Sequence, residues 1–246
     1  MKIRCFISSL IIVFAMAALL NAREILVGIS PIRPPFMYVD ENDEIKGYDP
    51  DIARAVLKKL GHTPKFVNMT YDGLIPSLIT GKIEMIASGL SINDERKKKI
   101  DFSDYYNETG SKIAVLETSN IKSLKDLKGK KVGAEIGTVQ ADFANENAKK
   151  YGYKVVIFNA ANEMFLDLIK KNGGIDAMIE NEILALNYNK TNNRKVKVVG
   201  EPIKPSKHAF GIQKDNEKFV EQVNDALKEL RDEGGQQRLH ELYFGF

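Results

Sequence analysis

The sequence has little cysteine, little excess charge and few long apolar runs. Its 246 residues include one cysteine, Cys5, so the chain can form neither an internal disulfide nor a cysteine-based zinc site. Lysine and arginine total 36, aspartate and glutamate total 33, and the formal net charge is +3. Charges this evenly balanced argue against nucleic-acid binding through bulk electrostatics, and we expect no nucleic-acid partner.

The one long apolar run lies at the N-terminus. Two basic residues precede it, it extends over 5–20, and a small residue follows at Ala22. This order is typical of a secretory signal peptide, which we assign to 1–22 with cleavage after Ala22. The alternative is an uncleaved membrane anchor, but a spanning helix needs about 20 apolar residues. Cys5 precedes the apolar core and therefore cannot carry a lipoprotein anchor, so we expect export to the periplasm without a lipid anchor.

Strand-like and helix-like segments alternate along the rest of the chain. In 48–60, for example, Ile52, Val56 and Leu60 recur four residues apart and Gly61 follows, which predicts a helix. The alternation predicts two α/β units, one on each side of 112–118, each with helices packed on a parallel sheet. The expected strands are 24–29, 65–69, 83–87, 112–116, 131–134, 155–158, 175–179, 196–199 and 209–213, with an extended connection at 201–207. The expected helices are 48–60, 72–80, a short capped one from Ser123, 139–150, 162–171 and 215–233, the last ended by Gly234-Gly235.

The ends of the parallel strands are the places where a ligand is expected. In open parallel sheets, ligands bind beyond the carboxyl ends of the strands. This rule selects the loops 30–36, 88–96 and 136–140 and the strand end at 180–181.

The loop 88–96 has the composition of an anion site. Its small residues leave backbone N–H groups free to face an anion, and Arg96, five residues after Ser91, can hold a carboxylate with two parallel hydrogen bonds. The alternative is a turn with a surface arginine.

Thr138, at the start of a predicted helix, offers a hydroxyl and the positive end of the helix dipole. Its alternative is a simple helix N-cap.

Signals for catalysis are weak. His62, His208 and His240 are scattered without metal-ligand spacing, and we interpret them as surface or packing residues. The chain has no Gly-x-Ser-x-Gly elbow and no phosphate-binding Gly-x-x-x-x-Gly-Lys loop. No pair of carboxylates is singled out by its spacing. We therefore expect no catalytic residue, no metal and no cofactor.

Several short motifs together resemble the polar amino-acid branch of the periplasmic solute-binding proteins that serve ABC importers (family 3 extracellular solute-binding proteins). Each motif is weak alone, but the set follows the family's order and spacing over essentially the whole exported chain. The matching stretches are Pro34-Pro35-Phe36, Gly47-Tyr48-Asp49-Pro50-Asp51-Ile52-Ala53, Tyr71-Asp72-Gly73-Leu74-Ile75-Pro76-Ser77-Leu78, Ser91-Ile92-Asn93-Asp94-Glu95-Arg96, Asp101-Phe102-Ser103-Asp104-Tyr105-Tyr106 and 123–133.

The resemblance implies a two-lobed α/β fold of the type II periplasmic-binding-protein kind. Each lobe is a sheet flanked by helices, and two crossover strands join the lobes. Lobe 1 is expected to comprise 23–112 and 206–246, and lobe 2 to comprise 113–205. A ligand would bind in the cleft, and hinge closure would bury it.

The resemblance also implies binding roles for individual residues. Arg96 matches the arginine that clamps the ligand α-carboxylate, with Ser91 from its own lobe and Thr138 from the other. Ser88–Gly89 matches the positions that receive the ligand ammonium. Tyr71 matches the aromatic residue that packs on the ligand side chain.

Two positions depart from the family pattern. Arg33 lies where cation-binding members have an aromatic residue, and Ser30 lies where they have an acid. An arginine facing the cleft would disfavour cationic ligands, whereas the alternative is that Arg33 points to solvent.

The second departure is Asn181, which replaces the usual acid that pairs with the ligand ammonium. Either Glu180 or Glu182 takes over that role, or neutral oxygens hold the ammonium, or the ligand lacks one.

The expected function is capture of a polar amino acid, or a related small carboxylate, and delivery to an ABC importer permease in the inner membrane. We expect a monomer that does no chemistry. One alternative is a periplasmic lyase of the cyclohexadienyl dehydratase type on the same scaffold, with Glu180 as its general acid. The other is a sensory ligand-binding domain, which would need a separate signalling partner.

Overall fold

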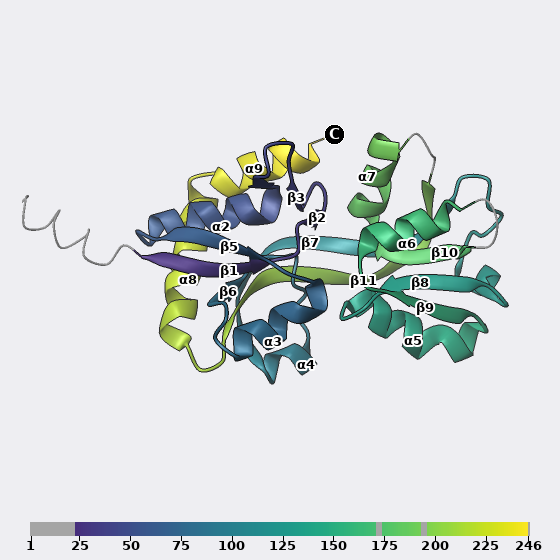
Figure 1. Cartoon of the computed structure of the whole chain (residues 1–246), viewed down its shortest axis with the longest axis horizontal. Coiled ribbons are helices and arrows are strands. Elements are labelled where there is room, and N and C mark those ends of the chain that lie inside the picture. Colours follow the sequence, from purple (N-terminus) through teal and green to yellow (C-terminus); the bar gives the residue numbers. More distant parts are fainter. Residues whose placement is uncertain (1–22, 171–173, 193–195, 246) are drawn as a thin grey trace, which may run out of the picture.

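The structure, a computed structural model, describes residues 23–170, 174–192 and 196–245. The predicted signal peptide, with Cys5, lies outside the described residues, and so does the last residue of the predicted helix 162–171. Figure 1 shows two groups of strands and helices, with strands β7 and β11 running across both. The expected two-lobed α/β fold with two crossover strands is therefore confirmed.

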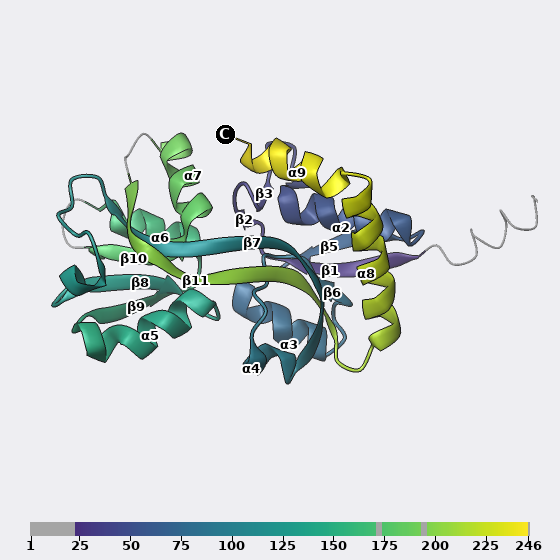
Figure 2. The ribbon, with the colours of Figure 1, turned by 180° about the vertical axis from the view of Figure 1, so that it is seen from behind.

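One eight-stranded sheet, in the order β5-β1-β6-β11-β7-β10-β8-β9, continues through both lobes. Its central pair is β7 (Ile100–Leu116) and β11 (Val196–Gln213), which are antiparallel and extend from one lobe to the other, as Figure 2 shows from behind. The sequence predicted only short strands here, 112–116 for the first and 196–199 plus 209–213 for the second. That prediction was wrong because register shifts interrupt β11, including those on either side of Ile203. Such irregularities tolerate proline and break the alternation by which a strand is recognised.

In the first lobe, β1 (Glu24–Ile29) lies between β5 (Thr63–Asn68) and β6 (Met85–Ile86), and all three are parallel. Helices α2 (Tyr48–Lys59), α8 (Glu217–Asp232) and α9 (Gly235–Phe244) cover one face, and α3 (Leu74–Ile79) packs on the other. The helix α9 was not expected. Gly234, interpreted as a stop, has a left-handed backbone that ends α8 and serves as the N-cap of α9.

In the second lobe, β8 (Lys131–Glu135) lies between β9 (Lys154–Phe158) and β10 (Ala177–Asn181) in a parallel arrangement. The helix α5 (Val139–Tyr151) covers one face, and α6 (Ala161–Leu168) and α7 (Glu182–Asn192) lie on the other. Strand β10 joins the central pair by antiparallel pairing with β7. The alternating strands and helices predicted for this region are present, and α7 is an addition.

The remaining elements are short. Strands β2 (Ile32–Arg33), β3 (Met37–Val39) and β4 (Ile45–Lys46) form a separate small sheet, and the short helices are η1 (Tyr71–Gly73), α4 (Asp94–Lys97) and η2 (Leu124–Leu127). Elements of two to four residues hold too few positions to show a hydrophobic period, so only the helix near Ser123 was predicted. No helix among the described residues is long and apolar enough to cross a membrane.

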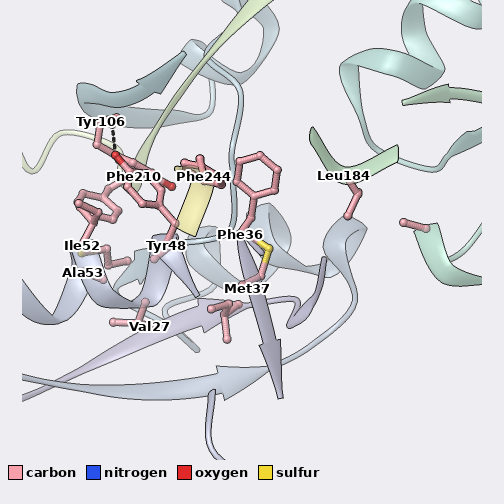
Figure 3. Close-up of a cluster of buried hydrophobic side chains, with 14 of the residues drawn as sticks. Val27, Phe36, Met37, Tyr48, Ile52, Ala53, Tyr106, Leu184, Phe210 and Phe244 are labelled. Atoms are coloured by element: carbon pink, nitrogen blue, oxygen red, sulfur yellow. Dashed lines mark hydrogen bonds between the residues drawn. The ribbon is translucent and has the colours of Figure 1, made fainter. Parts of the chain in front are cut away.

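A hydrophobic core extends from α2 towards the second lobe. Figure 3 shows Phe36 and Met37 from the Pro-Pro loop and β3 beside Tyr48 of α2, with Leu184 of α7 approaching from the second lobe. The hydroxyl of Tyr48 donates a hydrogen bond to the Tyr106 carbonyl at 2.9 Å, as the dashed line in Figure 3 marks. This packing holds the loop at the end of β1 against the first lobe.

Gly47 allows this loop to pack closely on the start of α2. Its φ is +124°, and a Cβ atom there would lie 2.4 Å from the Phe36 carbonyl oxygen. Gly47→Ala is therefore expected to lower the free energy of unfolding by about 2–3 kcal/mol, measured by urea denaturation. Gly61→Ala is the matched control, because Gly61 has φ +74° with open space around it. An equal loss in the two variants would contradict the steric explanation.

Candidate functional site

The carboxyl ends of β1, β6, β8 and β10 meet where the two lobes touch. Between them lies a small cavity of about 20 Å³, lined from the first lobe by residues such as Ser88 and from the second by residues such as Gln140. Six of the nine predicted site residues line it, namely Arg33, Tyr71, Ser88, Gly89, Ser91 and Asn181. The cavity is also lined by residues that were not predicted as site residues, namely Phe36, Met37, Gln140, Leu184 and His208. Phe36 and Gln140 are the last residues of the loops 30–36 and 136–140 that the strand-end rule selected. The other three could not be selected, because only the fold brings them next to these loops.

Arg33 points inward from β2 and joins the lobes. Its guanidinium forms an ion pair with Glu135 and lies 3.9 Å from the Glu180 carboxylate, both on second-lobe strands. The guanidinium also lies 5.1 Å from the centre of the Tyr71 ring. Burial opposes the charge of Arg33, but attraction to Glu135 and Glu180 outweighs burial and raises its pKa. The alternative that Arg33 points to solvent was therefore wrong.

The two carboxylates around Arg33 are almost completely buried. The exposed fraction is 1% for the Glu135 side chain and 2% for the Glu180 side chain. Burial raises the pKa of Glu180, while the charge of Arg33 opposes that shift. Sequence spacing gave no sign of this pair, because the two residues are the end of β8 and the penultimate residue of β10, strands that become neighbours only in the sheet.

Arg96 also lies at the junction of the lobes. One guanidinium nitrogen donates to the Ser91 carbonyl at 2.5 Å, and the other donates to the Gly137 carbonyl of the second lobe at 2.8 Å. The residue is 7% exposed, which argues against the surface-arginine alternative. It does not line the small cavity but borders a neighbouring open pocket of about 330 Å³, and Tyr71 lines both.

Thr138 and Asn181 both serve as helix caps. The Thr138 hydroxyl accepts a hydrogen bond from the Ala141 N–H at 3.1 Å, the geometry of an N-cap on α5. The side-chain oxygen of Asn181 accepts from the N–H groups of Ile183 and Leu184 at 2.9 and 3.2 Å at the start of α7. Both side-chain oxygens are thus already engaged by backbone donors.

The turn at Ser88–Gly89 forms the first-lobe wall. The Ser88 hydroxyl accepts a hydrogen bond from the Ser30 N–H at 3.0 Å, which ties the ends of β1 and β6 together. Gly89 has φ +59°, and a Cβ there would contact Asp49 and His208 at 3.4–3.5 Å. The turn therefore lies against a buried polar group, one member of which also lines the cavity.

Asp49 and His208 form this buried polar group, which the sequence did not predict. Burial raises the pKa of Asp49 to about 8, and the Tyr106 hydroxyl, the Gly89 N–H and Arg33 oppose the shift. These groups lie near the carboxyl, but among the described residues none forms a hydrogen bond of normal geometry with either Asp49 oxygen. Burial, followed by Arg33 and Arg96, lowers the pKa of His208 to about 3, so its imidazole is neutral near pH 7. His208 is a buried packing residue, with its ring edge-on to that of Phe36, and it also lines the cavity, which the interpretation as a surface or packing residue did not include.

The chain is similar to known proteins over nearly its whole length. The model of the bacterial extracellular solute-binding proteins, family 3, matches residues 25–246. The arginine-binding extracellular protein ArtP of Bacillus subtilis (strain 168) is 33% identical over 224 residues, which cover 90% of this chain and 86% of ArtP. A solved ancestral arginine-binding protein bound to glutamine has a TM-score of 0.84 and 40% identity, covering 91% of this chain and 98% of that one.

A third relative connects the fold to an enzyme. The solved ancestral amino acid-binding protein AncCDT-1, a precursor of cyclohexadienyl dehydratase, has a TM-score of 0.82 and 35% identity, and the match covers 90% of this chain and 95% of that one. The matches extend over nearly the whole described chain, in agreement with the family motifs and the two-lobed fold. This chain belongs to the family 3 bacterial extracellular solute-binding proteins.

Proposed function

We propose that the protein binds an amino acid between its lobes and delivers it to an ABC importer. The observation that carries the proposal is Arg96, a buried arginine whose guanidinium reaches carbonyl groups of both lobes beside Tyr71. A guanidinium presents parallel N–H groups that match a carboxylate. The α-carboxylate of a ligand would take the place of the carbonyl partners and join the lobes more strongly. The relatives named above bind arginine or glutamine, which supports an amino acid as the ligand.

Opening and closing of the lobes is part of this proposal. The cavity of about 20 Å³ holds little more than one water molecule, so an amino acid enters only when the lobes separate. The boundaries we propose are 23–112 plus 206–246 for lobe 1 and 113–205 for lobe 2, with the hinge in the crossover strands β7 and β11. The ligand favours the closed form only to the extent that it binds the closed form more tightly than the open form.

The cellular setting follows from the family and the N-terminal sequence. We propose export through the signal peptide 1–22, cleavage after Ala22, and a monomer without a lipid anchor in the periplasm. The ligand-bound form would dock on the importer permease in the inner membrane. The balanced charge of the chain supports a small-molecule ligand over a nucleic acid.

Binding without catalysis is the function that the site supports best. A lyase of the cyclohexadienyl dehydratase type is the second candidate, because AncCDT-1 is similar and because burial raises the pKa of Glu180 as a general acid requires. Glu180, however, already accepts a hydrogen bond from the Asn181 N–H at 2.7 Å and lies beside Arg33. Turnover of prephenate that disappears in Glu180→Gln would support the lyase, and its absence would support a binding protein.

The test of the proposed function is amino-acid binding by Arg96→Ala. Removing a buried charged partner of the ligand carboxylate costs about 2–5 kcal/mol, so affinity should fall by at least about 30-fold. Isothermal titration calorimetry against a panel of amino acids measures this loss. Arg96→Lys keeps the charge without the paired donors and should bind with intermediate affinity.

Arg238→Ala is the control, because Arg238 is an exposed arginine of α9 away from the cavity. Its affinity should equal that of the unaltered protein. Unchanged affinity in Arg96→Ala would disprove the carboxylate clamp.

A further inference from the structure

Four buried charges surround the place where the lobes meet, two of each sign. Arg33 and Arg96 supply the positive charges, and Glu135 and Glu180 supply the negative ones. Asp49 and His208 contribute little charge near neutral pH, since burial raises the pKa of the carboxyl to about 8 and lowers that of the imidazole to about 3. The four buried charges at the junction of the lobes therefore sum to zero.

Arg33 lies between the cavity and the two glutamates. It lines the cavity, whereas Glu135 and Glu180 are in contact with its guanidinium and do not line the cavity. Phe36 and Met37, close to Arg33 in sequence, are buried in the core, so the loop that carries the arginine is held in place. Arg33 thus separates a ligand from two carboxylates that would otherwise attract a cation.

This charge balance has a consequence for selectivity. A zwitterionic amino acid with an uncharged side chain brings no net charge into the site. A ligand with a cationic or anionic side chain brings one extra charge into a space where burial of an unmatched charge is strongly unfavourable. Polar but uncharged groups, including Gln140 and Ser88, line the cavity and can meet the ligand side chain.

We propose that Arg33 is a specificity-determining residue that neutralises Glu135 and Glu180 and so selects amino acids with an uncharged polar side chain. The inference rests on the proposed function, because it names the ligand class of that same site. It also extends the expectation that an inward-facing Arg33 disfavours cationic ligands: an anionic side chain is disfavoured as well, because two carboxylates already match the charge of Arg33. The opposite outcome is that a cationic ligand displaces Arg33 and takes its place against the glutamates.

The test is a charge-swap series measured by calorimetry at pH 7.5 with glutamine, arginine and glutamate as probes. The unaltered protein should bind glutamine at least 10-fold more tightly than arginine or glutamate. Arg33→Gln leaves one net negative charge and should move the arginine-to-glutamine affinity ratio at least 10-fold towards arginine. Glu135→Gln leaves one net positive charge and should move the glutamate-to-glutamine ratio in the same way towards glutamate. Arg33→Lys keeps the charge and should keep the preference for glutamine.

The preference of the unaltered protein tests the inference even where a variant fails to fold, and circular dichroism identifies such a variant. Tighter binding of arginine than of glutamine by the unaltered protein would overturn the inference and leave the proposed function standing. An affinity ratio unchanged in a folded Arg33→Gln would also overturn it. If the unaltered protein binds no amino acid, the proposed function itself fails, and the inference fails with it.

Discussion

Asp49→Asn is expected to stabilise the protein at alkaline pH, by up to about 6 kcal/mol. Asp49 is fully buried, and its pKa is about 8 in the folded state against an ordinary value of 3.8. A carboxyl whose pKa is raised by folding is accommodated well only while it is protonated. Its contribution to the free energy of unfolding is therefore complete below about pH 4 and is lost as the pH rises to about 8. Each pKa unit corresponds to about 1.4 kcal/mol, and asparagine cannot ionise. The advantage of the variant should therefore grow between pH 4 and 8 and level off above.

Urea denaturation at several pH values between 4 and 9 measures this difference. The comparison between variant and unaltered protein isolates Asp49, although His208 acts in the opposite direction at acid pH. Its pKa is lowered to about 3 from 6.5, so its contribution to stability is lost as pH falls through that window. Asp225→Asn, an exposed carboxyl on α8, is the control and should show no such trend. A difference independent of pH would mean that Asp49 is ionised in the folded protein throughout.

Removal of Glu135 is expected to destabilise the fold by about 3–5 kcal/mol. Glu135→Ala leaves the buried guanidinium of Arg33 with the Glu180 carboxylate at 3.9 Å as its remaining described ion-pair partner. An uncompensated buried charge is strongly unfavourable, whereas replacing both members of a buried pair by apolar residues is often close to neutral. The triple variant Arg33→Met with Glu135→Met and Glu180→Gln leaves no member of this buried group charged, and it should therefore regain most of the lost stability. Urea denaturation of the single and triple variants measures the difference.

A surface ion pair provides the comparison. The Nζ atom of Lys98, just after α4, lies 2.5 Å from Oε1 of Glu95 in that helix, and both side chains are exposed. Because solvent screens such pairs, Glu95→Ala should change stability by less than about 1 kcal/mol. A similarly small loss in Glu135→Ala would show that Arg33 finds another partner or turns to solvent, and it would weaken the charge-balance argument for selectivity.

The regular parts of the fold were predictable from local patterns. The helix α2 follows from Ile52 and Val56 at helical spacing and from the glycine after it, and the strand β1 is bounded as expected. The strand-end rule also directed attention to loops that meet at one cavity. Local patterns work here because each of these elements buries one face and shows a regular period.

The crossover strands were harder to predict, and the reason is geometric. Strands β7 and β11 pass from one lobe to the other, so the side that faces a core changes along each strand, and register shifts interrupt the alternation. No single period describes such a strand. Two expected strands and an extended connection are therefore one element in the structure.

By itself, the sequence determined the family, the two-lobed fold and the loops that carry the site, because these depend on motif order and local periodicity. Only the tertiary structure decided the electrostatics of that site. The partner of Arg33 is Glu135, 102 residues later, and the two meet because β2 and the end of β8 lie on opposite sides of the lobe junction. Whether a charge is paired, buried or free depends on such distant neighbours, and no spacing along the chain records them.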